Sequence, residues 1–374
     1  MAASTGLLYV GFNQDHGCFA CGTDSGFRIY NCDPFKQTFR RDFLNGGIGI
    51  VEMLFRCNIL ALVGGGNNPR YPPNKVMIWD DHQNRCIGEL SFRSEVKAVK
   101  LRRDRVVVVL EYKVYVYNFA DLRMLHHFET ISNPKGLCSL SPSSSTCVLA
   151  CPGLQKGHLR VELFDIRRPT LIAAHESALS CLALNLDGTR LATASERGTL
   201  IRVWDSHSGA PLHELRRGAE AAEIQSLAFD FEALWLAVSS DHGTVHVFSL
   251  NPSSTVPVIT GRSDPASVSK AADSEVAANT KSSLSFLSGV LPQSLMPKYI
   301  SSQWSVAQFH TPGHPAVHSA TRTICAFGSE RNTLIVISSD GSFFKCSFDP
   351  QRGGECRRES FARYLQADDE ERDL

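Results

Sequence analysis

Short runs of alternating or continuous apolar residues recur along most of the chain. Seven of them end in an aromatic residue followed by Asp, Asn or Ser, and successive aromatics stand 49, 38, 47, 40, 44 and 100 positions apart. Repeats of about 40–45 residues with a Trp-Asp-like end are typical of β-propeller blades, which have four strands each. The pattern predicts an all-β fold in which residues 1–374 form one seven-bladed, WD40-like β-propeller. The seven pairs are Tyr30-Asn31, Trp79-Asp80, Tyr117-Asn118, Phe164-Asp165, Trp204-Asp205, Phe248-Ser249 and Phe348-Asp349.

The repeat is clearest before Trp204. Residues 175–184 are mainly apolar and predict a first strand, and Asp187-Gly188 predicts a turn. A second strand is expected over 191–195 and a third over 200–205, with another turn between them. Strands of this kind bury their faces blade against blade around a ring.

The interval of 100 positions contains more chain than one blade needs. The excess falls in residues 251–300, which are rich in Ser, Thr, Ala, Asp and Lys and contain three prolines. Such a composition predicts a long flexible loop inserted in the sixth blade. The acidic residues 366–374 predict a solvated C-terminal tail.

One part of this loop is apolar. Leu284, Leu287 and Leu291 match the i, i+3, i+7 stripe of a short amphipathic helix, accompanied by Phe286 and Val290. Such a helix can insert shallowly at the headgroup boundary of a membrane. The alternative is that it packs back on the sixth blade.

Overall charge does not direct the chain to a polyanion. Lys plus Arg and Asp plus Glu both number 38, so the formal net charge is zero. No nucleic-acid partner is expected, and any basic site must be local. The most apolar run, 106–110, is far shorter than the ~20 residues of a membrane-spanning helix. Without a recognisable secretory signal, the twelve scattered cysteines predict buried thiols of a reduced, cytoplasmic protein.

No motif predicts catalysis, a cofactor or a metal. Cys18 and Cys21 form a CxxC, but in a strand positions three apart point to opposite faces and cannot chelate one ion. His126-His127 has no carboxylate or thiol at a usable spacing. The glycines at 64–66 lack the Gly-Lys-Ser/Thr of a phosphate-binding loop. We therefore expect a protein that is not an enzyme.

The segment Leu215-Arg216-Arg217-Gly218 lies between the fifth and sixth repeats. Adjacent side chains of an extended segment project to opposite sides, so the two arginines can serve two pockets. A planar guanidinium suits bidentate binding of phosphate. Gly218 would let the backbone turn closely into the next strand. The alternative is a pair of solvated surface arginines.

Both flanking repeats offer groups that suit a phosphorylated ring. Hydroxyls and imidazoles can donate to phosphate oxygens, and an additional arginine supplies positive charge. The alternative for each residue alone is ordinary turn or strand chemistry. The candidates are His175, Ser195, Thr199 and Arg202 in the fifth repeat, and Ser240, Thr244 and His246 in the sixth.

At these residues the sequence resembles the PROPPIN (WIPI) family of propellers, and it is most similar to the branch of WIPI-3 and WIPI-4. The resemblance extends over nearly all of the chain. The residues that carry it include 62–66 (LVGGG), 72–80 (PPNKVMIWD), 133–138 (NPKGLC), 195–203 (SERGTLIRV), 215–218 (LRRG), 297–299 (PKY) and 324–328 (ICAFG).

The resemblance implies binding of phosphatidylinositol 3-phosphate and phosphatidylinositol 3,5-bisphosphate. Arg216 is expected to face the fifth-repeat candidates and Arg217 the sixth-repeat candidates, while the region around Phe286 and Leu287 matches the family's membrane-inserting loop. It also implies a monomer in solution that is recruited peripherally to the phagophore, endosomal or vacuolar membranes. There it would bring in an autophagy lipid-transfer protein and other autophagy proteins. A WD-repeat interaction scaffold without lipid dependence is the alternative.

Overall fold

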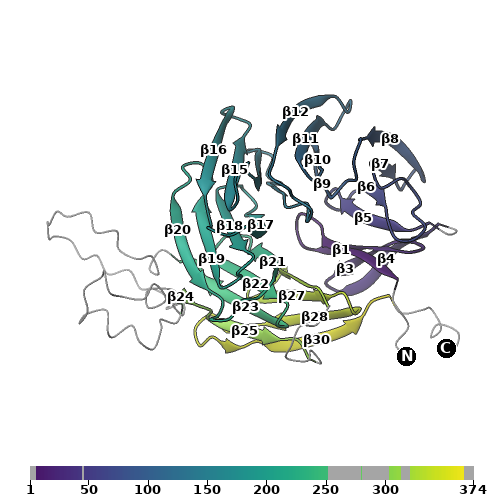
Figure 1. The fold of residues 1–374 in the computed structure, drawn as a ribbon. Coiled ribbons are helices and arrows are strands. Elements are labelled where there is room, and N and C mark those ends of the chain that lie inside the picture. The colour runs from purple at the N-terminus through teal and green to yellow at the C-terminus, as the bar shows by residue number, and fades with distance from the viewer. Residues whose placement is uncertain (1–5, 44–45, 252–278, 280–302, 313–320, 366–374) are drawn as a thin grey trace, which may run out of the picture.

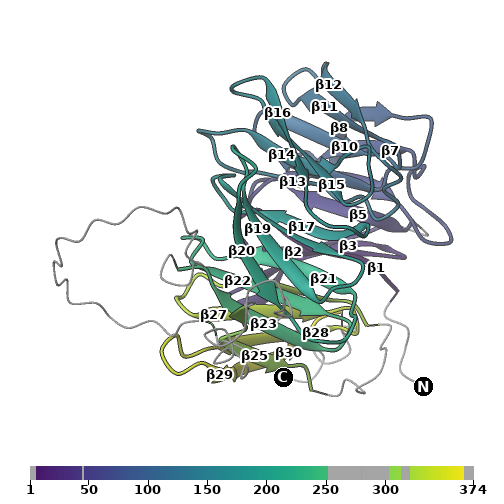
Figure 2. The same ribbon diagram turned by 60° about the vertical axis from the view of Figure 1, so that its left-hand side comes forward.

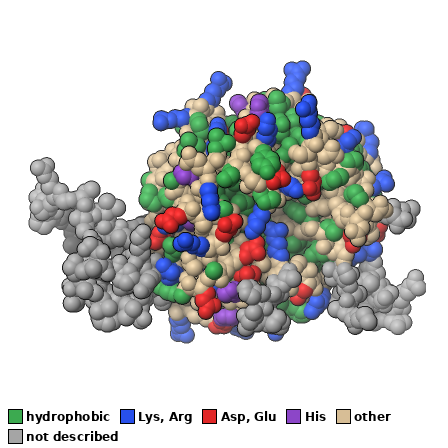
Figure 3. All heavy atoms as spheres, viewed as in Figure 1, with side chains coloured by type: hydrophobic (Ala, Val, Ile, Leu, Met, Phe, Trp, Pro, Cys, Tyr) green, Lys and Arg blue, Asp and Glu red, His purple; other side chains and the backbone are tan. Residues whose placement is uncertain are grey.

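Seven β-sheets surround a central axis in the computed structural model (Figure 1), which describes residues 6–43, 46–251, 279, 303–312 and 321–365. Five sheets have four antiparallel strands, and the other two have a short fifth strand at one edge as well. Each sheet is one blade, and Figure 2 shows the ring turned by 60°. Figure 3 shows that positive and negative side chains are intermixed over the face seen in Figure 1. The described residues form strands and turns but no helix. The predicted seven-bladed propeller is confirmed.

Blade one contains β1 (Leu7–Phe12), β2 (Cys18–Thr23), β3 (Gly26–Cys32) and β4 (Phe35–Asp42). Blade two contains β5 (Ile48–Met53), β6 (Ile59–Gly64), β7 (Lys75–Asp80) and β8 (Arg85–Ser91). Blade three contains β9 (Ala98–Arg102), β10 (Arg105–Val109), β11 (Lys113–Asn118) and β12 (Met124–Glu129). Blade four contains β13 (Ser139–Leu140), β14 (Val148–Pro152), β15 (His158–Leu163) and β16 (Arg168–Ala173). Blade five contains β17 (Leu179–Leu184), β18 (Arg190–Ser195), β19 (Leu200–Asp205) and β20 (Pro211–Arg216). Blade six contains β21 (Ile224–Phe229), β22 (Trp235–Ser240), β23 (Thr244–Ser249) and β25 (Ala307–His310), and blade seven contains β26 (Thr323–Phe327), β27 (Thr333–Ser338), β28 (Ser342–Ser347) and β30 (Arg357–Arg363).

Every one of the seven aromatic pairs lies at or directly after the end of the third strand of its blade. The aromatic ring packs against the neighbouring blade: Trp204 of blade five, for example, is buried among apolar residues of blade four. This packing between blades explains why the pair repeats with the blade. In the fifth repeat the first strand begins at Leu179, not at 175 as predicted, because Ala174 and His175 both donate to the carbonyl of Gly157.

Side-chain packing closes the ring between blades one and seven. All strands of blade one come from the N-terminal part of the chain and all strands of blade seven from the C-terminal part. The rings of Phe19 and Phe343 stack with centroids 6.1 Å apart, and the Tyr30 hydroxyl accepts from the Leu365 amide at 3.2 Å. As predicted, Cys18 and Cys21 point to opposite faces of their strand, one towards blade two and the other towards blade seven.

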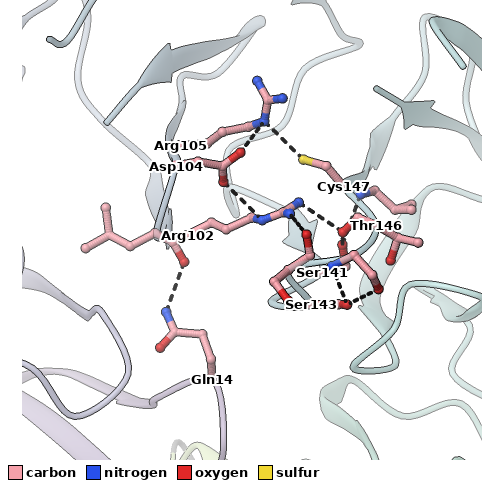
Figure 4. A network of polar contacts seen from close by, with 12 residues as sticks. Gln14, Arg102, Asp104, Arg105, Ser141, Ser143, Thr146 and Cys147 are labelled. Carbon is pink, nitrogen blue, oxygen red and sulfur yellow. Dashed lines mark hydrogen bonds and ion pairs between the residues drawn. The ribbon is translucent and has the colours of Figure 1, made fainter. Parts of the chain in front are cut away.

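Buried polar side chains also join the blades. Arg102 of blade three is 5% exposed and donates from Nη1 to the Thr146 carbonyl of blade four at 3.0 Å, while Asp104 balances its charge (Figure 4). Gln14 of blade one donates from Nε2 to the carbonyls of Met53 and Leu101, in blades two and three, at 2.6 and 3.1 Å. Such bonds fix the blades relative to one another, because a buried polar group left without a partner is costly.

Two short strands cover the outer edges of blades five and six. β24 (Gln303–Trp304) runs parallel to the end of β20, and β29 (Gly354–Glu355) runs parallel to β25. Residues 251–300, which are predicted to form a loop, lie between β23 and β25 in the chain, and of them only Asn251 and Asn279 are within the described residues. The apolar candidates of this loop and the acidic tail lie outside the described residues.

Candidate functional site

The arginine pair lies where the outer strand of blade five ends. Arg216 is the last residue of β20, and its backbone lies between Leu200 of β19 and Trp304 of β24. The amide of Arg217 continues the ladder by donating to the Thr199 carbonyl at 3.0 Å. The pair is therefore held by the sheet on one side and followed by the connection to blade six on the other.

Arg217 is a buried cation without a carboxylate partner in the described chain. Its side chain is only 7% exposed; Nε donates to the Gly198 carbonyl at 3.2 Å, Nη2 donates to the Glu220 carbonyl, and Nη1 lies 3.4 Å from Nδ1 of His242. Burial lowers the pKa of this guanidinium, and the more distant carboxylates of Asp241 and Glu220 only partly oppose the effect. An arginine remains charged under these conditions, so the site carries positive charge that a bound anion would balance.

The close approach to Gly198 depends on glycine at that position. Gly198 has φ of +59°, and an added Cβ would lie 1.7 Å from the carbonyl oxygen of Ala222. Gly218 is different: its φ is not positive, and an added Cβ would meet no atom within 4 Å. The structure therefore shows no close approach at Gly218 that would exclude a side chain.

The sixth-blade candidates lie on the face of blade six that packs against blade five, because strand alternation places them on the same face as Val238 and Phe248. Ser240 is 1% exposed, and its Oγ has no hydrogen-bond partner among the described residues. Nδ1 of His246 lies 3.1 Å from the Ser305 hydroxyl, and burial, aided by the positive charge of Arg217, lowers the pKa of His246 to about 4. Thr244 begins β23 and is half-buried. A neutral imidazole, an unpartnered hydroxyl and an uncompensated guanidinium are together suited to hold a phosphate.

The fifth-blade candidates form a second group, in which His175 and Arg202 already have hydrogen-bond or ion-pair partners. Nε2 of His175 lies 2.9 Å from the Thr193 hydroxyl, and burial, with the nearby charge of Arg202, lowers its pKa to about 4. Arg202 donates from Nη1 to the Ala174 carbonyl at 2.6 Å, and its Nε lies 2.9 Å from a carboxylate oxygen of Glu214. The structure thus brings His175 and Arg202 together, but the charge of Arg202 is already paired.

The remaining candidates of this group lie close by in the sheet. Ser195 ends β18 and is buried, while Thr199 precedes β19 and is half-buried. On Arg216, Nη1 lies 3.4 Å from the Gly218 carbonyl. The assignment of these residues to a headgroup pocket remains a prediction.

Sequence reasoning did not select three residues that contact the candidates. Thr193 pairs across the sheet with Arg202 and bonds His175, so the alternation of the strand could have indicated it. His242 lies in the turn between two chosen residues, Ser240 and Thr244. Ser305 is 59 positions from His246, and no local pattern relates the two.

The described chain offers no group of three or more His, Cys, Asp or Glu that could hold a metal ion. Among the same residues, none forms a helix long and apolar enough to cross a bilayer.

A family model described as PROPPIN matches residues 6–360. The chain belongs to the PROPPIN family. Among curated relatives, this PROPPIN is 43% identical over 353 residues to Autophagy-related protein 18e of Arabidopsis thaliana, covering 93% of this chain and 85% of the relative. The assignment to the branch of WIPI-3 and WIPI-4 remains a prediction.

Solved structures of similar fold support the propeller. Hsv2 of Kluyveromyces marxianus superposes on this PROPPIN with a TM-score of 0.72 at 20% identity, covering 96% of this chain and 99% of that chain. Atg21 in a complex with the coiled coil of Atg16 superposes with a TM-score of 0.72 at 22% identity, over 96% and 99% of the two chains. At these identities the likeness concerns the fold.

Proposed function

We propose that this PROPPIN binds phosphatidylinositol 3-phosphate and phosphatidylinositol 3,5-bisphosphate at membranes through two pockets that flank Arg216 and Arg217. The observation that carries the proposal is the state of Arg217, which is 7% exposed, held by two backbone carbonyls and without a carboxylate partner in the described chain. Keeping a charge buried and unpaired is costly unless a ligand compensates it. A phosphomonoester, with about −1.5 to −2 charge near neutral pH, supplies that compensation.

The two pockets are not equivalent in this proposal. Around Arg217 the Ser240 hydroxyl is available, and no ion pair must break before an anion binds. Around Arg202 a phosphate must compete with Glu214. We therefore expect the sixth-blade pocket to contribute more to affinity than the fifth-blade pocket.

The inserted segment supplies the third contact in this proposal. Its apolar residues Leu284, Phe286, Leu287, Val290 and Leu291 would enter the membrane after the headgroups bind. Its returning end supports this, because β24 pairs with the backbone of Arg216 and Ser305 contacts His246. Contacts linked in this way act at high effective concentration, and avidity can exceed a single site by ~10²–10⁴.

Recruitment of autophagy proteins completes the proposal. A relative 43% identical is named as an autophagy-related protein, and the structure of Atg21 contains the coiled coil of Atg16. We infer that this PROPPIN likewise binds autophagy proteins, including a lipid-transfer protein, at the forming autophagosome and at endosomal or vacuolar membranes.

Vesicle co-sedimentation tests the lipid step. Three proteins are compared: wild type, the double variant Arg216→Ala/Arg217→Ala and the control Arg123→Ala. Each is mixed with vesicles of neutral lipid alone, or of neutral lipid with phosphatidylinositol 3-phosphate or phosphatidylinositol 3,5-bisphosphate. Arg123 is a suitable control because its side chain is 85% exposed and its nearest carboxylate is 3.5 Å away. Selective pelleting that the double substitution abolishes and Arg123→Ala leaves intact would support the proposal. Equal behaviour of all three proteins on all vesicles would overturn it and favour a protein-interaction scaffold without lipid dependence.

A further inference from the structure

A cavity of about 380 Å³ lies between blades six and seven, at the turns that join the first and second strands of each blade. Its apolar lining includes Trp235, Phe327 and Leu234, together with Phe231, which is 44% exposed. Trp235 and Phe327 both contact Phe348, at ring-centroid distances of 5.0 and 6.4 Å. Trp235 and Phe327 are 8% and 3% exposed, so they form a rigid floor of the cavity, and Phe231 supplies more of its accessible aromatic surface. Aromatic side chains are enriched at protein–protein interfaces.

Carboxylates surround this apolar surface. Asp230, Glu232 and Glu330 line the cavity, against one lining guanidinium, Arg331. Arg331 is 90% exposed and lies 3.6 Å from Glu232, so the pair is weak. Lys345 lies 3.0 Å from Glu330, but it also lies 2.8 Å from Asp33 and 4.0 Å from Glu359. The cavity thus has an excess of negative charge.

Asp230 closes the turn between β21 and β22, and this turn does not require the charge of a carboxylate. Its Oδ1 accepts from the Trp235 amide at 2.8 Å and closes the turn between β21 and β22. In blades one and five the same bond is made by neutral side chains: Asn13 accepts from Cys18 at 3.0 Å, and Asn185 accepts from Arg190 at 2.9 Å. Asparagine therefore suffices for this bond, so the turn alone does not require a carboxylate in blade six. Burial raises the pKa of Asp230 and the nearby charge of Glu232 adds to the rise, while backbone amides that donate to the carboxylate oppose it.

We propose that this cavity docks a peptide segment of a partner protein that presents a bulky apolar side chain two positions from Lys or Arg. In an extended segment residues two apart point to the same side, so the apolar side chain can contact Trp235 and Phe327 while the cation meets Asp230 and Glu232. Complementary charge selects basic segments over acidic ones.

The docking cavity is separate from the proposed lipid site. Trp235 begins β22 and Ser240 ends it, so the two sites lie at opposite ends of one strand, about 16 Å apart. A segment can therefore dock while headgroups are bound. The proposal does not depend on lipid binding.

The experiment uses the full chain labelled with 5-fluorotryptophan. The protein has four tryptophans, so ¹⁹F spectra contain four signals, and Trp235→Phe assigns the one at the cavity. The probes are acetyl-Leu-Ala-Arg-amide and its matched control acetyl-Leu-Ala-Glu-amide, titrated to about 10 mM, because peptides this small bind with dissociation constants of roughly 1 mM. We expect the basic probe to shift the Trp235 signal selectively and the acidic probe to leave it in place.

Charge-removing variants complete the test. Asp230→Asn and Glu232→Gln should each lower the affinity for the basic probe at least about threefold. The asparagine of Asp230→Asn can still close the turn, as asparagine does in two other blades. The control Glu176→Gln changes an exposed carboxylate elsewhere and should have no effect. Equal shifts with both probes, shifts of all four signals or no shift at all would overturn the proposal. Unchanged affinity in Asp230→Asn and Glu232→Gln would do the same. Vesicle binding by Asp230→Asn should equal that of wild type, which separates a failure here from a failure of the lipid proposal.

Discussion

Nη1 of Arg217 lies 3.4 Å from Nδ1 of His242, and this contact joins the end of blade five to a turn of blade six. The guanidinium also reaches the carbonyls of Gly198 and Glu220, so its position is fixed from both blades. No carboxylate of the described chain lies within ion-pair distance of it. A fixed, uncompensated cation at a blade junction is preorganised for an anion, since little side-chain entropy remains to be lost on binding.

Lysine cannot replace Arg217. The three donors of this guanidinium, Nε, Nη1 and Nη2, each reach a different partner, and a single ammonium cannot match that geometry. We expect Arg217→Lys to weaken binding to phosphatidylinositol 3-phosphate vesicles by about tenfold although the charge is retained. Arg123→Lys is the matched control and should bind as wild type does. Wild-type affinity of Arg217→Lys would mean that charge alone determines binding.

Glu214 is expected to inhibit the fifth-blade pocket. Its carboxylate lies 2.9 Å from Nε of Arg202, and a phosphate must displace it. Because both side chains are about one-third exposed, the pair is worth little, and Glu214→Gln should raise lipid affinity by roughly threefold. Surface plasmon resonance on vesicles measures the change, with Glu176→Gln as the control. A decrease in affinity would show that Glu214 supports the pocket.

Stability should fall as the solution becomes mildly acidic. The buried imidazole of His246 has a pKa of about 4, below the ordinary value of 6.5, so the unfolded chain takes up its proton first as the pH falls. The free energy of unfolding is unaffected by this group above pH 6.5, decreases as the pH falls from 6.5 to 4 and stays low below that. At pH 5 the loss is about 2 kcal/mol for this one histidine.

Urea unfolding at pH 7 and pH 5 tests this, comparing wild type with His246→Gln. The variant should lose less stability between the two pH values, whatever its stability at pH 7. His158→Gln, which changes a half-exposed histidine of blade four, is the control. Identical pH dependence in wild type and His246→Gln would contradict the assignment of a depressed pKa.

Gln14 should be important for stability although it lies far from the arginine pair. Its amide donates to the carbonyls of Met53 and Leu101 and accepts from the Phe55 amide at 2.7 Å, so one side chain connects three blades. Gln14→Ala removes all three part-buried bonds, and we expect a loss of about 2–3 kcal/mol. Thermal unfolding measures it; Gln83→Ala, whose bonds are local to one turn, should cost less than about 1 kcal/mol. A loss in Gln14→Ala no larger than in Gln83→Ala would show that the three-blade connection adds little.

The propeller, its seven blades and the position of the arginine pair between blades five and six could be predicted from the sequence. This was possible because blade packing imposes the same aromatic pair at the end of every third strand, as at Trp79 and Trp204, and because strand alternation separates Cys18 from Cys21. These constraints are local, so they produce periodic patterns that can be recognised in the sequence. The candidate residues near Arg216 and Arg217 were likewise found in the two repeats that flank the pair.

Which of the arginines near the site are paired with a carboxylate could not be predicted from the sequence, because it depends on tertiary contacts. Arg217 and Arg202 look alike in the sequence, yet one is held by carbonyls and the other is paired with Glu214, because strand register sets which side chains meet. Ser305 reaches His246 across 59 positions, and the docking cavity takes its walls from two blades. Such long-range pairings depend on how the blades pack in the ring, and no pattern within one repeat specifies them.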